Sequence, residues 1–171
     1  MRVLLTTFSA VGHFHPLAPL AAAALRRGDE VVIATGENLA DWVQSCGFEF
    51  APVGMALPSV LAETQKRFAG PELAFRCFTT VAVPPMAQDL LSLANTWHPD
   101  LIVHEETEYG APLVAKLLGL PCVTQSYTAP ARPVAERAAM RFSARYDPWS
   151  STDRQHFPRT GSRRQGAQLR T

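Results

Sequence analysis

The feature that most limits the fold of this sequence is a regular alternation of short apolar runs and helical segments over residues 1–130. The apolar runs are no longer than six residues and rich in β-branched side chains, which is typical of strands covered on both faces. Strands are expected at residues 3–8, 30–35, 48–53, 100–104 and 122–125. Helices are expected at residues 16–27, 38–46, 86–97 and 109–118, with weaker helical pieces at 60–68 and 72–81. This alternation predicts one α/β domain.

The alternation also predicts how the strands are connected. Parallel neighbours need a crossover of about a dozen residues or more, so strands that alternate with helices favour a parallel sheet. Right-handed crossovers that cover both faces give a doubly wound, Rossmann-like sheet. The longest connection, residues 54–99, would carry the chain back across the sheet, which predicts the strand order 3-2-1-4-5. Such sheets bind ligands at the carboxyl ends of the strands where the order reverses, here between the first and fourth strands.

Two polar segments follow the strands beside this reversal. The first strand runs into a loop that contains Gly12 and His13, and the fourth runs into a carboxylate cluster that begins with Glu105. The loop has one glycine where a dinucleotide or nucleoside triphosphate cradle needs two or three. It is therefore not predicted to bind NAD or to hydrolyse a nucleoside triphosphate.

The histidine of this loop is a candidate general base. His13 stands just before the predicted helix at 16–27, and the positive end of that helix disfavours a charged imidazole. A carboxylate from Glu105 on the other ring nitrogen would fix the tautomer and stabilise the imidazolium once it forms. The alternative is that His13 is a satisfied, partly buried histidine and Glu105 an ordinary solvated carboxylate.

Neither a metal centre nor a disulfide framework is expected. His13 and His15 form a His-x-His pair, but no cysteine or carboxylate accompanies them at ligand spacing. The three cysteines are far apart and odd in number, which favours reduced thiols in a cytoplasmic protein. The apolar start of the chain breaks at residues 12–16, so no signal peptide is predicted. No stretch approaches the roughly 20 apolar residues of a membrane span.

The end of the chain differs from the rest in charge. Residues 1–131 carry a net charge of −5, and residues 132–171 carry +6 because they hold nine arginines. The total of +1 gives no overall field to attract nucleic acid or anionic membranes. From about residue 141 no apolar periodicity survives, so a basic, non-globular tail is expected at 141–171. An out-of-frame coding sequence and a native basic tail that binds nucleic acid or a partner both fit this composition.

Several pieces of the sequence form a recognisable set. They are Val3–Thr7 with Gly12–Leu20, Gly28–Thr35, Pro99–Glu105, Gly110–Leu113 and Leu118–Pro121. Together they resemble the N-terminal half of GT-B-fold glycosyltransferases, and most closely the bacterial enzymes that glycosylate antibiotics and other natural products. The resemblance implies an acceptor-binding domain at residues 1–140. It also implies a C-terminal donor domain with a His-Gly-Gly-rich loop, which is not expected in this chain.

The resemblance further implies roles for single residues. His13 matches the base that removes the proton of the acceptor hydroxyl, and Glu105 matches the acidic position, often Asp, that orients it. Ser9 and Gly12 would belong to a loop that contacts the donor. The implied acceptor-binding residues are Phe14, Phe75, Phe78, Met86 and Glu106. Phe68 is a further candidate for an apolar wall, although aromatics at this spacing more often belong to a core.

The leading hypothesis is the acceptor half of an inverting glycosyltransferase that uses a UDP- or TDP-linked sugar and a hydrophobic natural product. No cofactor beyond this co-substrate, no nucleic acid and no membrane partner are expected, and a homo-oligomer is left open. The nucleotide-sugar would bind only if a donor domain is supplied, so the chain alone is expected to be inactive. One alternative is a non-catalytic module, either for small molecules or as the acceptor-binding subunit of a two-chain transferase. Another is a metal-dependent hydrolase built on His13 and His15.

Overall fold

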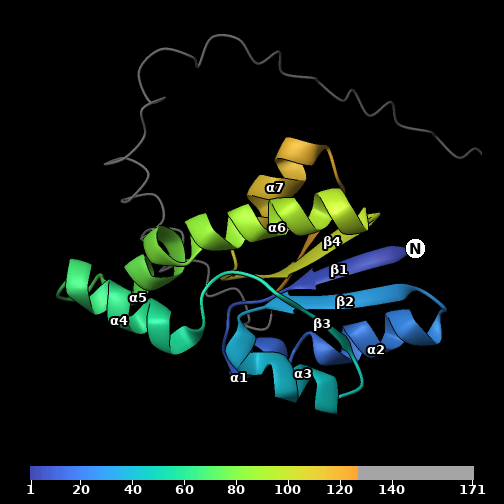
Figure 1. Ribbon diagram of the computed structural model, residues 1–171, viewed down its shortest axis with the longest axis horizontal. Helices are drawn as coiled ribbons and strands as arrows, with labels where there is room; N and C mark the ends of the chain where they lie inside the picture. The colour runs from blue at the N-terminus through green and yellow to red at the C-terminus, as the bar shows by residue number, and fades with distance from the viewer. Residues whose placement is uncertain (127–171) are drawn as a thin grey trace, which may run out of the picture. The chain divides into compact units, whose positions relative to one another are not determined.

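The computed structural model describes residues 1–126 and gathers five strands into one wholly parallel sheet (Figure 1). The strands are β1 (Arg2–Thr6), β2 (Glu30–Thr35), β3 (Glu49–Pro52), β4 (Leu101–Glu105) and β5 (Cys122–Gln125). Their order is β3-β2-β1-β4-β5, which confirms the predicted order and its reversal between β1 and β4. The domain boundary predicted at residue 140 and the predicted tail at 141–171 lie outside the described residues.

The central strand β1 shows why the apolar runs are continuous. Leu5 is in register with Ile33 of β2 and Val103 of β4, and these three side chains share one face of the sheet. Leu4, one residue earlier, points to the opposite face. All four side chains are buried. Because helices cover both faces, successive side chains in the middle of the strand are apolar, as is usual in parallel sheets.

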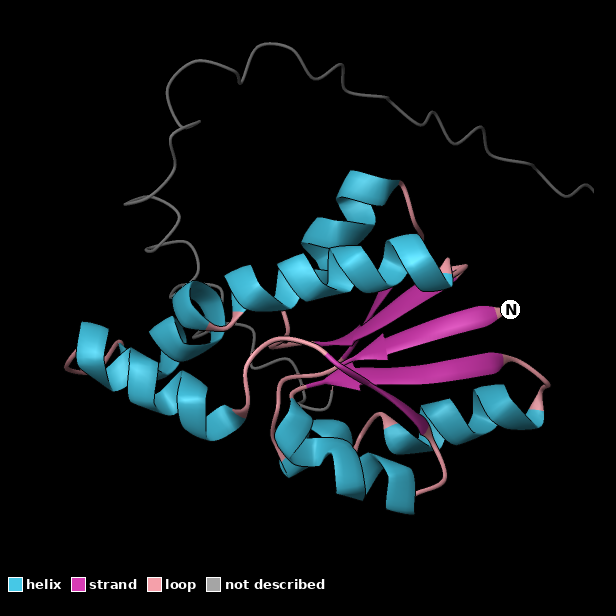
Figure 2. Ribbon diagram, in the orientation of Figure 1, coloured by secondary structure: helices cyan, strands magenta, loops and turns pink. Residues whose placement is uncertain are grey.

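Helices cover the two faces as two separate layers (Figure 2). One face carries α1 (Val11–Phe14), α2 (Ala18–Arg26) and α3 (Ala40–Ser45), the last preceded by the 3-10 turn η1 (Glu37–Leu39). The other face carries α6 (Val83–Trp97) and α7 (Gly110–Leu118). Each interface has its own core of buried side chains, the first around Leu5 and Phe14 and the second around Leu4 and Leu90.

The long connection between β3 and β4 forms a third and smaller core at the carboxyl end of the sheet (Figure 1). It contains α4 (Leu57–Arg67), α5 (Leu73–Arg76) and a five-residue π-helical turn, η2 (Cys77–Val81), where two weak helices were expected. Phe8, just past β1, packs there with Val60, Cys77 and Val81. The connection therefore lies against the edge of the sheet where the ligand site is predicted.

One local difference from the predicted structure affects the site. The segment predicted as a loop forms α1, a single helical turn with His13 in its last turn, and α2 begins at Ala18 rather than at Pro16. The prediction that His13 stands just before a helix N-terminus is therefore wrong, because His13 lies within α1 and α2 begins only at Ala18. Because α1 begins at Val11, His13 lies near the negative end of its own helical turn, and the helix-dipole argument for a neutral imidazole does not apply.

The two helices of the second layer end in the same conformation. Gly119, the residue after α7, has φ 68°, and His98, the residue after α6, has φ 52°. Glycine adopts this left-handed conformation without strain, whereas a residue with a Cβ does so at a cost. At 15 residues, α6 is the longest helix in residues 1–126, and none of the helices there is long and apolar enough to cross a membrane.

Candidate active site

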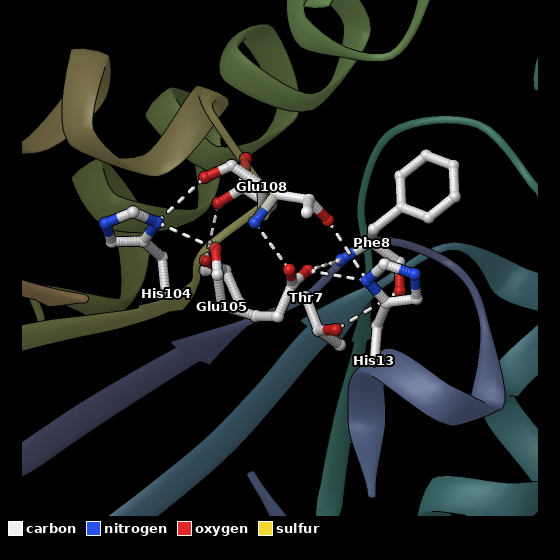
Figure 3. Close-up of polar contacts among 8 residues, drawn as sticks. Thr7, Phe8, His13, His104, Glu105 and Glu108 are labelled. Atoms are coloured by element: carbon white, nitrogen blue, oxygen red, sulfur yellow. Dashed lines mark hydrogen bonds and ion pairs between the residues drawn. The ribbon is translucent and has the colours of Figure 1, made fainter. Parts of the chain in front are cut away.

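The candidate site lies where the carboxyl ends of β1 and β4 meet (Figure 3). Thr6, the last residue of β1, is in register with His104 of β4. Glu105 ends β4, and His13 reaches the same place from α1. Two segments that are far apart in the sequence therefore come together at the predicted reversal of strand order.

His13 and Glu105 are in direct contact. The imidazole Nδ1 lies 3.1 Å from the carboxylate Oε2. The Glu105 side chain is fully buried, whereas 18% of the His13 side chain is exposed. An ionised carboxylate can only accept, so the Nδ1 proton is directed at Glu105 and the neutral ring keeps its lone pair on Nε2. The structure thus brings together the two residues predicted as a base and its partner.

Glu105 is held by neighbours on several sides. The backbone N–H of Phe8 donates to Oε2 at 3.4 Å, and the backbone N–H of Thr107 donates to Oε1. The Thr107 hydroxyl oxygen lies 3.0 Å from Nδ1 of His13. Burial by itself raises the pKa of Glu105, but the hydrogen bonds from His13 and Thr107 outweigh it, and the pKa falls below the usual value. Glu105 is therefore suited to be an ionised partner for an imidazolium.

Aromatic rings lie against the imidazole. The ring centres of Phe8 and Phe78 are 5.4 and 5.8 Å from that of His13 and 4.6 Å from each other. Beside them is a hollow lined by Phe8, Phe78, Ala82, Val83, Met86, Thr107, Glu108 and Tyr109. Its volume of about 10 Å³ is that of roughly one water molecule. The hollow therefore marks an apolar wall next to the base, not a pocket already shaped for a large ligand.

The predicted acceptor-binding residues are only partly gathered at this wall. Phe78 and Met86 line the hollow, and Met86, only 6% exposed, also belongs to the core of the second layer. Phe75 is half-buried on α5 and is not among the lining residues. Phe68 carries two arginine guanidinium groups over its ring, each 5.3 Å from the ring centre.

The prediction that Phe14 binds the acceptor is wrong. Phe14 is fully buried in the first core, with its ring centre 6.2 Å from that of Phe48. The cause is the helical turn α1, in which neighbouring residues point about 100° apart. When His13 points to the carboxyl edge of the sheet, Phe14 must point elsewhere, and it points into the core.

The remaining predicted residues are Ser9, Gly12 and Glu106, and they differ in exposure. Gly12 is exposed on α1, whereas Ser9 is only 2% exposed and its hydroxyl contacts the Asn38 side chain. Glu106 is half-buried in the turn after β4, where its carboxylate accepts a hydrogen bond from Ser126. The donor contacts of Ser9 and Gly12 and the acceptor contact of Glu106 stay predictions.

The histidine pair does not form a metal site in the described part of the chain. The ring of His15 lies 5.7 Å from that of Trp42, whereas the ring of His13 lies beside Phe8. Within residues 1–126 there is no group of three or more His, Cys, Asp or Glu side chains placed to hold a metal ion.

A second buried carboxylate lies near the pair, and the sequence analysis did not assign it. Glu108 is 3% exposed and accepts a hydrogen bond from the Thr6 hydroxyl at 2.6 Å. It also accepts from the backbone N–H groups of Gly110 and Ala111, which begin α7. Burial raises the pKa of Glu108, and these hydrogen bonds offset it only in part. Glu108 therefore ties the start of α7 to the end of β1.

The His104 side chain contacts the backbone of the same turn. Its Nδ1 lies 2.8 Å from the backbone oxygen of Glu108 and 3.0 Å from that of Glu105, and its Nε2 lies 2.8 Å from the Thr124 hydroxyl. Carbonyl oxygens only accept, so Nδ1 carries the proton.

The sequence analysis assigned no role to Thr107 or Glu108, although both belong to the polar run after β4. A sequence pattern does not show which side chain of a turn faces the histidine.

Comparison with known proteins places the chain in a family. Residues 23–156 match the family model described as erythromycin biosynthesis protein CIII-like, N-terminal domain. The 10-deoxymethynolide desosaminyltransferase of Streptomyces venezuelae is 31% identical over 147 residues, which cover 70% of this chain and 34% of the relative. The L-demethylnoviosyl transferase of Streptomyces niveus is 32% identical over 135 residues, which cover 74% and 35%. The chain thus spans about a third of the length of the curated relatives it matches.

Solved structures agree with this result. The Streptomyces sp. SF2575 glycosyltransferase matches with a TM-score of 0.66 at 34% identity, over 74% of this chain and 39% of the other. The glycosyltransferase VinC in complex with dTDP matches with a TM-score of 0.65 at 26% identity, over 90% and 41%. These matches confirm the predicted fold, the N-terminal domain of a GT-B glycosyltransferase. The chain belongs to the family of erythromycin biosynthesis protein CIII-like N-terminal domains.

Proposed function

We propose that this chain is the acceptor-binding half of an inverting glycosyltransferase. The reaction moves a sugar from a TDP- or UDP-linked donor to a hydroxyl of a hydrophobic natural product. The observation that carries the proposal is the contact between His13 and the buried Glu105, at the carboxyl edge of the sheet and beside an aromatic wall. The names of relatives support this class of acceptor, since three of them are named for 10-deoxymethynolide, aklavinone and tylactone.

The His13–Glu105 pair supplies a general base. With Nδ1–H directed at Glu105, Nε2 takes the proton of the acceptor hydroxyl while the hydroxyl oxygen forms a bond to the anomeric carbon. The bond from that carbon to the donor phosphate oxygen breaks, and its electron pair leaves with the nucleoside diphosphate. Attack in line with the leaving group inverts the configuration of the carbon. The ionised Glu105 stabilises the imidazolium, and general-base help of this kind is typically worth about 10²–10⁴-fold.

The wall beside the base suits an apolar acceptor. Phe8 and Phe78 lie against the imidazole, and Tyr109 is 40% exposed among the residues that line the hollow. An aglycone placed against these rings would bury apolar surface and bring a hydroxyl to Nε2. The aromatic wall therefore selects the class of acceptor, while His13 selects the position on it that reacts.

Most of the donor binding is assigned to groups outside the described residues. Charge stabilisation of the leaving diphosphate needs cations or helix N-termini, and orientation of the reactants supplies up to about 7–11 kcal/mol. About two thirds of the length of each relative lies outside the match, in line with a separate donor domain. The 171-residue chain by itself is expected to bind an apolar acceptor weakly and to transfer no sugar.

A chimera tests the proposal. Residues 1–126 of this chain would replace the matching segment of the Streptomyces sp. SF2575 glycosyltransferase, which has a solved complex with thymidine diphosphate. Transfer from a TDP-sugar to polyketide aglycones would be followed by mass spectrometry, and the anomeric configuration of the product by NMR. We expect transfer with inversion by the chimera, and none by its His13→Ala variant or by the chain alone.

The other outcomes separate the alternatives. A chimera that binds the aglycone but transfers no sugar would contradict the enzymatic proposal and favour a non-catalytic acceptor-binding module. Transfer that does not depend on His13 would keep the reaction and discard His13 as its base. Retention of the anomeric configuration would exclude the single in-line attack.

A further inference from the structure

Thr107 touches both members of the His13–Glu105 pair. Its hydroxyl oxygen lies 3.0 Å from Nδ1 of His13, and its backbone N–H donates to Oε1 of Glu105. The other carboxylate oxygen, Oε2, lies 3.1 Å from the same Nδ1. His13, Glu105 and Thr107 therefore form a closed ring of contacts, which we call the base cluster.

The two contacts of Thr107 have different consequences. The backbone N–H holds one carboxylate oxygen, which leaves the other oxygen facing His13, and this contact does not depend on the side chain. The hydroxyl also hydrogen-bonds the Glu105 carboxylate, and its oxygen is a second acceptor for the Nδ1 proton beside Oε2 of Glu105. A single contact would let the imidazole turn about it, whereas two contacts at one ring nitrogen restrict both its plane and its tautomer.

We propose that Thr107 is a positioning residue, whose hydroxyl holds the imidazole of His13 in the tautomer and orientation that direct Nε2 toward the acceptor. Its part in sugar transfer rests on the proposed function, whereas its effect on the imidazole does not. Thr107 is half-buried and lines the hollow beside Phe8 and Phe78, so its hydroxyl lies where the base meets the apolar wall.

The competing explanation is that Thr107 serves only the turn after β4. The backbone contact with Glu105 would then be sufficient, and the hydroxyl could be removed without effect on His13. Valine keeps the shape of threonine and removes the hydroxyl, whereas serine keeps the hydroxyl. This pair of substitutions separates the two explanations.

The experiment measures the tautomer of His13 by ¹⁵N NMR of the ring nitrogens in the 171-residue chain. Spectra are taken at about pH 8.5, above the range in which histidines usually titrate. The His13 signals are identified by their loss in His13→Gln. In Thr107→Val the ratio of the Nδ1–H to the Nε2–H form should fall about fivefold, as for the loss of one hydrogen bond of about 1 kcal/mol. In Thr107→Ser it should stay within about twofold of the wild type.

Controls keep the result specific. Thr96→Val is the matched substitution, because the Thr96 hydroxyl donates to carbonyls of its own helix, and it should leave the His13 ratio unchanged. Backbone amide spectra show that each variant is folded, and Thr107→Ala replaces Thr107→Val if the latter does not fold. An unchanged ratio in a folded variant without the hydroxyl would overturn the proposal. An equal fall in Thr107→Ser and Thr107→Val would overturn it as well.

The chimera adds a second measurement. There Thr107→Val should lower kcat about fivefold at nearly constant KM, and Thr107→Ser should restore it. A changed tautomer with an unchanged kcat would overturn the positioning role. A wild-type chimera without any transfer would contradict the proposed function, while the tautomer ratio would still decide whether the Thr107 hydroxyl holds the imidazole.

Discussion

The base cluster and a second group of residues both follow β4, and each is built around a buried glutamate. The second group, which we call the cap cluster, consists of Thr6, Glu108 and the first two residues of α7. In the base cluster the pKa of Glu105 falls below its usual value although burial alone raises it. In the cap cluster burial prevails, and the pKa of Glu108 is raised.

The difference shows that the partners of a buried carboxylate set its charge as much as its burial does. Glu105 contacts His13, which can itself become a cation, and it also accepts hydrogen bonds from the backbone N–H and the side chain of Thr107. The side-chain and backbone hydrogen bonds to Glu108 come from a neutral hydroxyl and from backbone amides. One carboxylate is therefore suited to stabilising a charged imidazolium, and the other to holding α7 against the end of β1.

The largest expected effect separates the clusters by activity. In the active chimera, Glu105→Gln should lower sugar transfer by about 10²–10⁴-fold, because an amide cannot stabilise the imidazolium. Glu108→Gln should lower it less than about tenfold, because an amide oxygen can still accept the hydrogen bonds from the first N–H groups of α7. Initial rates at saturating acceptor measure both. Equal losses would show that the two clusters act as one unit.

Stability should show the reverse order. Glu108→Ala leaves the Thr6 hydroxyl and the first N–H groups of α7 without their buried partner, so the free energy of unfolding should fall by about 1–3 kcal/mol. Urea unfolding of the 171-residue chain measures it. The matched control is Glu49→Ala at an exposed position of β3, where a change within about 0.5 kcal/mol is expected. An equal change at Glu49 would contradict the structural role of Glu108.

A smaller change tests one contact of the cap cluster. Thr6→Val removes the hydroxyl that donates to Glu108 at 2.6 Å and should lower the free energy of unfolding by about 1 kcal/mol. A double-mutant cycle with Glu108→Gln should give a coupling energy of about 0.5 kcal/mol or more, because the two side chains share this hydrogen bond. Additive effects would mean that the contact contributes nothing.

The smallest expected effect is the change in the free energy of unfolding with pH. Each carboxylate contributes to this change only through the difference between its folded and unfolded pKa. The pKa of Glu105 is lowered from 4.5, so its contribution is present above that value and is lost as the pH falls through the folded pKa. The pKa of Glu108 is raised from 4.5, so its contribution is present below that value and is lost as the pH rises through the folded pKa.

Unfolding free energies measured between about pH 3 and pH 8 test these signs. Relative to the wild type, Glu105→Gln should lose less stability on acidification, and Glu108→Gln should lose less as the pH rises. Thr96→Val, which removes no titrating group, serves as the control and should follow the wild-type curve. The same sign of change in both glutamine variants would remove the contrast between the clusters.

The sheet and its strand order could be predicted because they depend on patterns that are local in the sequence. Apolar runs mark buried strands, and the long crossover at 54–99 fixes where the order reverses. The segment at 11–14 could not be predicted in the same way. One helical turn gives no periodicity to detect, and it placed Phe14 in the core while His13 turned to the site.

Some residues of the candidate site could be predicted from the sequence and others could not, for the same reason. His13 and Glu105 could be brought together from the sequence, since each follows a strand and neighbouring parallel strands end at one edge of the sheet. Thr107 could not, because its hydroxyl meets His13 through the shape of a turn. Phe78 could be named only as one of several aromatics, and the packing of η2 against Phe8 placed it beside the imidazole.

By itself the sequence determined the fold and the edge of the sheet at which the polar side chains gather. The tertiary structure alone decided which side chains touch there and which charge each glutamate favours. The strand order follows from the apolar periodicity of each segment and from the lengths of the connections between segments. Both can be read directly along the sequence. A pKa depends on burial and on partners such as His13 and Thr6, which come from the other end of the domain and lie near Glu105 and Glu108 only in the folded chain.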